Sequence, residues 1–472
     1  MAALAFITAF PAVVMFGAWR FAGSQDDSAP PAPDVIAEFP ASQPSTPVLS
    51  ARRTPAVLAR ETSATAFEEA LRPLGGAVLP GSCAGVAVDG VTTLSDGIDT
   101  AVTPASTMKF IVAAVALDVL GADYTYTTEV RAEIAADGSV GSVYLVGGGD
   151  PLLSSDWYPD DAKFNRFPQQ PATSLDSLAD AVKAAGVNQI NGNVVADLSR
   201  YDSEFYAPGW EISLRNVEGG PISAVTVNDG WVRGDASKVI DPGAGAAREF
   251  YRLLAERGIT IVGQPASGAT PVGLATVATV SSAPLIQIVG EMLQNSDNNT
   301  AEMMLKEIGF VARKSGSRAS GDGVLAEKLT AWGVPMTGVV FDDGSGLSRN
   351  DKVTCAAFLA VLNRYKIGDP LVSVLAVAGQ SGTLQSYFGE TSVAGRLYGK
   401  TGSLNGVKAL IGYVDAGDGS QITFALLLES PNIDDPNQFR PIWEGPLAQA
   451  LGSYPAGPTS GQITPLPAVP TS

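Results

Sequence analysis

The strongest constraint on the fold is an unbroken apolar run at residues 110–117, Phe-Ile-Val-Ala-Ala-Val-Ala-Leu. Thr103 and Pro104 precede it as a helix N-cap and a first helical residue, and Gly121 is suited to end the helix. A helix that is apolar on all its faces must be covered on all of them. The sequence therefore predicts a buried helix at the centre of a layered domain.

The rest of the chain mixes strand and helix patterns. Residues 83–88 alternate like a strand and are followed by the hairpin signal Asp89-Gly90, and residues 295–311 are expected to be helical. An apolar fraction of 45% over 472 residues is ample for more than one core, so we expect a mixed α/β (α+β) protein of several domains. Three further segments are expected to be successive strands: 397–402, 408–415 and 421–429.

The chain contains no histidine, which limits the chemistry it can perform. Ser-His-Asp and Cys-His catalysis and HExxH zinc sites are excluded. In an enzyme working near neutral pH, lysine, a carboxylate, a hydroxyl or a cofactor would have to move the protons. The formal charge of −18 offers no basic field for nucleic acid, so we expect no nucleic-acid partner.

Three short motifs contain the side chains that could replace an imidazole. Each is weak by itself, because a Ser-x-x-Lys quartet arises by chance and Ser, Asp and Asn are ordinary helix caps. Together they are typical of an active-site serine served by two lysines and a second hydroxyl. The motifs are Ser106-Thr107-Met108-Lys109, Ser296-Asp297-Asn298 and Lys400-Thr401-Gly402.

The first motif is spaced to place Ser106 and Lys109 on one face of the predicted helix. Ser106 would lie in the first turn, where free N–H groups and the helix dipole favour a developing negative charge. Lysine can act as the base for a serine hydroxyl if burial or a second cation lowers its pKa. Lys109 borders the apolar run, and we expect Lys400 to lower the pKa of Lys109 by like-charge repulsion and to hold a substrate carboxylate.

With these and further motifs, the chain resembles the serine D-alanyl-D-alanine carboxypeptidase/endopeptidase family, the class C low-molecular-mass penicillin-binding proteins. The resemblance runs from about residue 80 to residue 450. The additional motifs are Gly147-Gly-Gly-Asp150-Pro151, Ala207-Pro-Gly-Trp210, Ser282-Ala-Pro-Leu285, Asp343-Gly-Ser-Gly-Leu-Ser-Arg349, Gly379-Gln-Ser-Gly-Thr-Leu384 and Lys400-Thr-Gly-Ser-Leu-Asn405.

The resemblance implies a serine-type peptidase that acts on peptidoglycan stem peptides, is inhibited by β-lactams and uses no metal or organic cofactor. Ser106 would form the acyl-enzyme, Lys109 would be its general base, and Ser296 would relay a proton toward the leaving D-alanine. The backbone N–H groups of Ser106 and Ser403 would form the oxyanion hole. The substrate-binding positions would be Asn298 for the amide, Lys400 and Thr401 for the terminal carboxylate, Arg349 and Asn405 for the donor side chain, and Ser403.

The resemblance also implies a domain plan. A penicillin-binding, β-lactamase-like domain with a five-stranded antiparallel sheet and helices would comprise residues 63–122 and 282–452, interrupted by a mostly β insert at 123–281. The 190 positions from Ser106 to Ser296 exceed those of a class A β-lactamase, whose Glu-x-x-Leu-Asn motif is absent, so that function is disfavoured. Only 86 positions separate Trp210 from Ser296, which predicts one insert domain with a second reduced or missing.

The two ends are expected to lie outside the fold. Residues 1–22 are predicted to be a signal peptide or membrane anchor, residues 23–62 a Pro/Ser/Ala-rich linker, and residues 453–472 a disordered Pro-rich tail. We therefore expect an exported protein at the extracytoplasmic face of the membrane or in the wall, with membrane attachment through the N-terminus left open. Cys83 and Cys355 either pair there or remain two buried thiols.

A non-catalytic alternative is a cell-wall-binding or regulatory protein that keeps the pocket and has lost turnover. The three motifs are all whole, which speaks against it. The balance of carboxypeptidase and endopeptidase activity and the oligomeric state are not encoded in any motif above.

Overall fold

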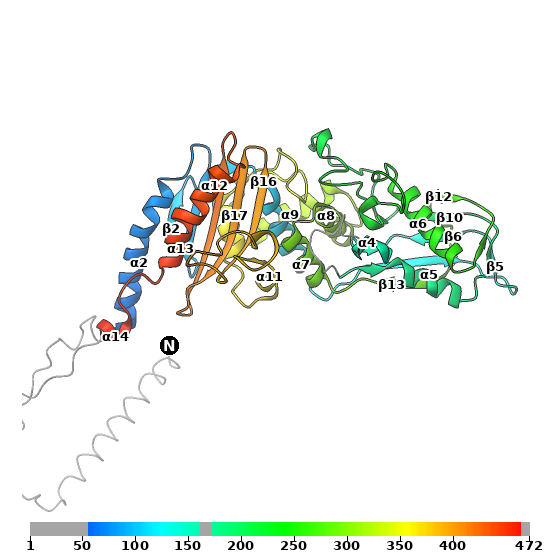
Figure 1. Cartoon of the computed structure of the whole chain (residues 1–472), viewed down its shortest axis with the longest axis horizontal. Coiled ribbons are helices and arrows are strands. Elements are labelled where there is room, and N and C mark those ends of the chain that lie inside the picture. Colours follow the sequence, from blue (N-terminus) through cyan, green and yellow to red (C-terminus); the bar gives the residue numbers. More distant parts are fainter. Residues whose placement is uncertain (1–54, 161–170, 464–472) are drawn as a thin grey trace, which may run out of the picture. The chain divides into compact units, whose positions relative to one another are not determined.

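The computed structural model describes residues 55–160 and 171–463. The expected signal peptide or anchor at 1–22 and most of the expected linker lie outside the described residues. Among the described helices, none has both the length and the apolar character needed to cross a membrane. Residues 55–463 form one compact unit in which two larger sheets have their own cores (Figure 1). We call residues 55–122 and 282–463 the main domain and residues 123–281 the insert. The predicted mixed α/β class is confirmed.

An antiparallel sheet forms the centre of the main domain, with the strand order β15-β16-β17-β18-β1-β2. Chain neighbours pair as hairpins, and β1 joins β18 from the other end of the sequence through the register Cys83↔Leu427. The five long strands match the expected sheet, and the two-residue β15 adds a sixth strand at its edge. The strands are β1 (Cys83–Val88), β2 (Val91–Asp96), β15 (Ala376–Val377), β16 (Leu397–Leu404), β17 (Val407–Asp415) and β18 (Gln421–Glu429), and a separate ribbon pairs β3 (Ala101–Val102) with β14 (Val353–Thr354).

Helices cover both faces of this sheet. On one face, α3 supplies a core in which every side chain from Met108 to Ala116 is buried, as its apolar sequence predicts. On the other face, α2 and the C-terminal helices enclose a second core around Phe67 and Trp443. The helices of the main domain are α2 (Pro55–Gly75), α3 (Met108–Val119), α7 (Leu285–Asn295), α8 (Asn298–Arg313), α9 (Arg318–Ala331), α10 (Cys355–Leu362), α11 (Pro370–Ser373), α12 (Pro436–Ile442), α13 (Ala448–Ser453) and α14 (Ser460–Ile463).

The insert has its own sheet and its own apolar core. Its strand order is β12-β10-β6-β4-β13, in which β6, β10 and β12 run parallel. Parallel strands need crossover connections, and α5 and α6 supply them, so the insert combines its strands with two helices that were not predicted. The elements of this sheet and its crossovers are β4 (Thr127–Ala132), β6 (Val143–Val146), α5 (Leu175–Ala184), β10 (Val194–Asp197), α6 (Pro242–Glu256), β12 (Pro265–Ser267) and β13 (Ala275–Ser281).

Shorter pieces complete the insert. A three-stranded ribbon has the order β11-β9-β5, and β7 pairs with β8. Residues 198–241, between β10 and α6, leave the sheet, and Trp210 packs there with Met303 and Leu347 of the main domain. The short elements are β5 (Ser139–Val140), β7 (Leu153–Ser154), α4 (Trp157–Asp160), β8 (Thr173–Ser174), β9 (Gln189–Ile190) and β11 (Thr260–Ile261).

Both predicted end boundaries need correction. Residues 55–62, expected in the linker, form the start of α2, because Phe67, Leu71 and Leu74 anchor that helix on the sheet. Residues 453–463, expected in the disordered tail, include the last residue of α13 and the short helix α14. The Tyr454 ring packs edge-on against Phe67 at 5.1 Å between ring centroids, so this part of the tail has an apolar anchor.

Two helix starts also differ from their predictions. Thr103 and Pro104 do not begin the α-helix; a short 3-10 turn, Ala105–Thr107, comes first and α3 starts at Met108. Ala105 has φ +47°, in the left-handed region, which interrupts a regular helix. The helix expected from residue 295 starts at Asn298, because Ser296 adopts the left-handed conformation that ends α7.

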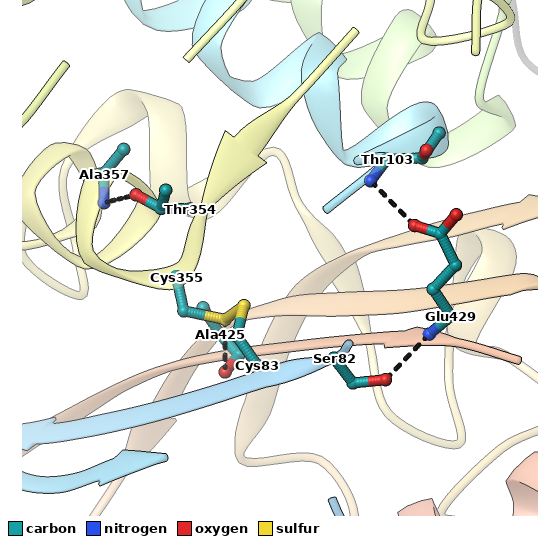
Figure 2. The surroundings of a disulfide bond; sticks show 8 residues. All are labelled: Ser82, Cys83, Thr103, Thr354, Cys355, Ala357, Ala425 and Glu429. Carbon is teal, nitrogen blue, oxygen red and sulfur yellow. Dashed lines mark hydrogen bonds between the residues drawn. A yellow bond between two sulfur atoms is a disulfide. The ribbon is translucent and has the colours of Figure 1, made fainter. Parts of the chain in front are cut away.

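A disulfide joins Cys83, the first residue of β1, to Cys355, the first residue of α10 (Figure 2). Both cysteines are fully buried, and no free cysteine remains. Next to Cys83, the Ser82 hydroxyl accepts a hydrogen bond from Glu429 N at 2.9 Å, and the Glu429 carboxylate accepts one from Thr103 N at 3.3 Å (Figure 2). The covalent link therefore lies beside the segment that leads into the first motif.

Candidate active site

The backbone around Ser106 is fixed by close approach of two glycines. A Cβ on Gly346 would lie 1.9 Å from the carbonyl oxygen of Ala105, and Gly346 has φ +78°. A Cβ on Gly402 of β16 would lie 2.8 Å from the carbonyl oxygen of Pro104. Only glycine allows these segments to pack so closely. The left-handed Ala105 is thus enclosed from two sides, and the Ser106 side chain is half-buried at the start of α3.

The Lys109 ammonium has three hydrogen-bond partners. Its Nζ lies 2.9 Å from Ser106 Oγ, 2.6 Å from Asn298 Oδ1 and 2.6 Å from the carbonyl oxygen of Ser345. The amide of Asn298 is oriented by its Nδ2, which donates to the carbonyl oxygen of Glu218 at 2.7 Å. Two of the three partners can only accept, so two N–H bonds of Lys109 are committed to them. The third position faces Ser106, where an amine would present its lone pair.

Burial lowers the pKa of Lys109 to about 8, because an ammonium loses its hydration in a fully buried site. The lysine is therefore close to the protonation equilibrium that a base near neutral pH requires. Four nearby carboxylates oppose the shift: Asp343, Asp297, Glu302 and Glu218.

The second motif lies at the junction of two helices. Ser296 ends α7 in a left-handed conformation with φ 61°, and Asp297 caps α8 by accepting a hydrogen bond from Thr300 N at 2.7 Å. The turn places Asn298 against Lys109 and Ser296 against Lys400. Asp297 therefore has the capping role expected for its residue type, while its two neighbours contact the lysines.

Lys400 is fully buried on β16. Its Nζ donates to Ser296 Oγ at 2.9 Å and to the carbonyl oxygen of Thr401 at 2.9 Å. Burial is the main cause that lowers the pKa of Lys400 well below its ordinary value, and the charge of Lys109 adds to it. Burial is the main cause of the lowered pKa at Lys109 as well. Because repulsion between two ammonium groups is mutual, the effect of Lys400 on Lys109 stays a prediction that adds to burial.

Buried charges support the loop that presents the Ser345 carbonyl. Glu302 Oε1 accepts a hydrogen bond from Ser345 N at 2.9 Å, and Arg318 Nε donates to Glu302 Oε2 at 2.6 Å. The Asp343 carboxylate accepts from Trp210 Nε1 at 2.7 Å, which ties the loop to the Ala-Pro-Gly-Trp motif. None of these residues was singled out for a role from the sequence, although the motifs that contain Asp343 and Trp210 were noted.

The three motifs line one cavity of about 590 Å³. Six further residues expected at the site line it with Ser106: Ser296, Asn298, Arg349, Thr401, Ser403 and Asn405. Arg349 donates to Glu211 Oε1 at 3.2 Å and to the carbonyl oxygen of Asn405 at 2.7 Å. The remaining lining residues are Glu211, Leu214, Glu218, Asn295, Leu347, Thr383, Leu404 and Asp434.

Thr383 is a lining residue that was not predicted from the sequence and that contacts a predicted one. It lies in a 3-10 turn, Gly382–Leu384, and its Oγ1 accepts a hydrogen bond from Thr401 Oγ1 at 2.9 Å. The Gly379–Leu384 motif was noted for its resemblance alone, and that motif was the signal that could have identified Thr383. No group of three or more metal-ligating side chains occurs in residues 55–160 and 171–463.

The geometry suits acyl transfer: a half-buried hydroxyl beside a buried amine of lowered pKa, and a second buried lysine bonded to a second hydroxyl in the same cavity. A family model described as D-Ala-D-Ala carboxypeptidase 3 (S13) matches this chain over residues 75–243 and 234–443. The match spans both the main domain and the insert.

Related proteins agree with that match. The chain is 30% identical over 447 residues to a carboxypeptidase DacB of Mycolicibacterium smegmatis, covering 89% of this chain and 91% of that protein. It is 29% identical over 408 residues to a D-alanyl-D-alanine carboxypeptidase of Actinomadura sp. (strain R39), covering 69% and 72%. The fold is similar to that of penicillin binding protein 4 from Haemophilus influenzae, with a TM-score of 0.67 and 20% identity over 81% of this chain and 98% of that one.

Proposed function

The chain belongs to the D-Ala-D-Ala carboxypeptidase 3 (S13) family, and on that premise we propose that it hydrolyses the D-alanyl-D-alanine bond of peptidoglycan stem peptides through an acyl-enzyme on Ser106. The observation that carries the proposal is the 2.9 Å contact between Lys109 Nζ and Ser106 Oγ in a buried site. The reaction removes the terminal D-alanine or, as an endopeptidase, cuts a D-alanyl cross-link.

In the first step, Lys109 in its amine form accepts the Ser106 proton while Oγ attacks the carbonyl of the penultimate D-alanine. The bonds from Lys109 to Asn298 and Ser345 keep the lone pair directed at Ser106. The backbone N–H groups of Ser106 and Ser403 receive the developing oxyanion, which is the largest electrostatic contribution such sites make.

Lys400 and Thr401 receive the terminal carboxylate. A carboxylate entering beside Lys400 raises the pKa of that lysine and favours its ammonium form, because opposite charges stabilise each other at low dielectric. An ammonium at Lys400 in turn favours the amine at Lys109, so binding of the correct substrate promotes the base form. Ser296, bonded to Lys400, relays a proton to the leaving nitrogen.

Asn298 binds the substrate amide, and Arg349 with Asn405 contacts the side chain of the donor peptide at the mouth of the cavity. The ion pair of Arg349 with Glu211 leaves Glu218 and Asp434 as further acidic groups on the lining. β-Lactams, which carry the same carboxylate next to a reactive amide, acylate Ser106 and inhibit the enzyme.

The site of action is extracytoplasmic, because peptidoglycan lies outside the membrane. We propose that residues 1–22 direct export and that the N-terminus provides membrane attachment where the segment is retained. The buried disulfide agrees with an oxidising compartment.

The test is covalent labelling. Ser106→Ala is expected to abolish labelling by a fluorescent penicillin, and mass spectrometry of the unsubstituted chain should show one adduct, on Ser106. Undiminished labelling of Ser106→Ala would refute the assignment of Ser106 as the nucleophile. Incubation with muropeptides should release D-alanine or cleave cross-links; a chain that is acylated by penicillin and yet releases nothing would be the non-catalytic wall-binding protein.

A further inference from the structure

Lys408 is a buried lysine that the reaction above does not use. It lies on β17 directly opposite Ser403 of β16 in the antiparallel register. The Lys408 side chain lies on the face of the sheet that points away from α3. It is there among the core residues that the C-terminal helices cover. Only 8% of the residue is exposed. An amine in such a position requires an explanation, because lysine is almost never fully buried without a partner.

Aromatic rings surround this ammonium. Its Nζ lies 3.9 Å from the ring centroid of Phe439, 5.3 Å from that of Trp443 and 6.0 Å from that of Tyr387. The rings also contact one another edge-on, with centroid separations between 4.8 and 5.8 Å. Ring faces attract a cation most strongly where water is excluded. The cage therefore stabilises a positive charge within an otherwise apolar core.

The only hydrogen bond of Lys408 among the described residues goes from its Nζ to Ser403 Oγ, at 2.7 Å. No described carboxylate forms an ion pair with it; Asp434 acts on it from a greater distance and uses Oδ1 to accept from Gly406 N at 2.7 Å. Burial lowers the pKa of Lys408 to about 8, with Asp434 opposing the shift. Arg440 and Glu444, from the helices that form the cage, are the other charged groups on this side.

The direction of the bond determines where the Ser403 proton points. An ammonium can only donate, so Ser403 Oγ accepts and its own O–H is directed away from Lys408. Ser403 lines the cavity of the active site. Thr401, two positions earlier on the same strand, donates its proton to Thr383 Oγ1. Ser403 can therefore donate to a substrate without breaking a hydrogen bond of the resting site, whereas Thr401 must first turn its hydroxyl away from Thr383.

We propose that Lys408 is a positioning residue: caged by Phe439, Trp443 and Tyr387, it holds the Ser403 hydroxyl so that its proton is donated to the terminal carboxylate of the substrate. The inference rests on the proposed function and adds to it a residue outside the cavity. The positive charge behind β16 also strengthens the Ser403 O–H as a donor, because hydrogen bonds polarise their neighbours in a low-dielectric interior.

The test compares two thioester substrates with the same N-acyl-D-alanyl donor, one with a carboxylate on its leaving group and one uncharged. Lys408→Met, which fits an apolar cage, is expected to lower kcat/KM for the carboxylate thioester about tenfold and for the uncharged one less than about twofold, because only the first uses the Ser403 proton. Equal losses on both thioesters would show that Lys408 serves only packing and would overturn the proposal.

A double-substitution cycle tests whether Lys408 acts through Ser403. In the Ser403→Ala background, Lys408→Met should not lower kcat/KM further for either thioester, because the hydroxyl through which Lys408 acts is gone. A second, multiplicative loss in that background would also overturn the proposal. Lys328→Met is the matched control, since this exposed lysine pairs with Asp118 on the surface and its loss should leave both rates unchanged.

If Lys408→Met does not fold, Phe439→Leu serves in its place, because it weakens the cage and keeps the ammonium. It should lower the rate for the carboxylate thioester about threefold and leave the uncharged thioester unchanged; equal effects on both would contradict the inference. Failure of the unsubstituted chain to turn over either thioester would instead refute the proposed function, and this inference with it.

Discussion

In the proposed mechanism, two buried lysines take the role at residue scale that an imidazole has in a chain with histidine. Imidazole has a suitable pKa without help, whereas lysine must lose hydration to reach it. Lys109 achieves this in a site where its three partners are all neutral, so that hydrogen bonds satisfy its N–H groups without an ion pair to fix the charge. The result is a lysine with a pKa of about 8, as the proposed base requires.

The pH dependence of acylation should report that value. At pH 7 a group with a pKa of about 8 is an amine about one-tenth of the time, so the rate should rise about tenfold per pH unit below pH 7 and level off above pH 8. The measurement is stopped-flow acylation by the uncharged thioester between pH 5.5 and 9.5. That substrate avoids the carboxylate-binding lysine, so a rate that does not change between pH 6 and pH 8 would contradict Lys109 as base.

Lys400 should be needed for charged substrates in particular. Lys400→Ala removes the group proposed to receive the terminal carboxylate, and we expect acylation by the carboxylate thioester to fall about 100-fold, because a buried, charge-assisted hydrogen bond is lost. The uncharged thioester should lose about tenfold or less, through the contact with Ser296. Equal losses on the two substrates would assign Lys400 to the proton relay and not to carboxylate binding.

At element scale the site depends on how closely three segments approach one another: the Ala105–Thr107 turn, β16 and the loop that contains Gly346. Gly346→Ala should disturb this arrangement. Its Cβ would overlap the Ala105 carbonyl, and with the cost of a positive φ we expect about 3 kcal/mol of lost stability and penicillin labelling at least about 100-fold slower. Thermal unfolding and labelling rates measure the two effects.

Gly333→Ala is the matched control for that substitution. Gly333 has φ +75°, close to that of Gly346, and nothing lies within 4 Å of a Cβ added there. It should cost about 1 kcal/mol through the backbone alone and leave labelling unchanged. If both substitutions had the same effect on labelling, the close approach of Gly346 to Ala105 would not matter for the site.

Strands and the spacing within a motif depend on residues that are close in sequence, and these features were predicted well. Residues 83–88 and 421–429 are strands with the expected bounds, and Ser106 and Lys109 lie within hydrogen-bond distance as their spacing implies. The start of α3 was predicted wrongly because the packing of Gly346 and Gly402 holds Ala105 in a conformation its own residue type disfavours. Such constraints arise between segments distant in sequence and leave no local pattern.

The same reason limited the prediction of the site. The convergence of the three motifs on one site was inferred from their residue types and from a resemblance, since no spacing in the chain places Ser296 beside Lys400. Thr383 and Lys408 contact the site only because β15, β16 and β17 pair side by side. The helices of the insert were missed as well, because the parallel order of its strands, which requires them, is a property of the folded sheet.

At the scale of the whole molecule, one covalent bond joins the two sequence halves of the main domain. Cys83 and Cys355 are 272 positions apart, and the intervening chain includes the insert and two of the three motifs. A cross-link over so long a loop reduces the entropy of the unfolded chain by an amount worth roughly 5 kcal/mol in the chain-entropy model. The disulfide should therefore contribute more to the stability of the main domain than any single buried side chain.

The paired substitution Cys83→Ala/Cys355→Ala should lower Tm and the urea midpoint, with a loss of stability of about 2 to 5 kcal/mol. Neither sulfur lines the cavity, so penicillin labelling of the folded variant should proceed at the unsubstituted rate. Because both cysteines are buried, thiols must be counted after unfolding: none without reductant and two with it. Two thiols in the oxidised, unfolded chain, or an unchanged Tm in the variant, would contradict a stabilising disulfide.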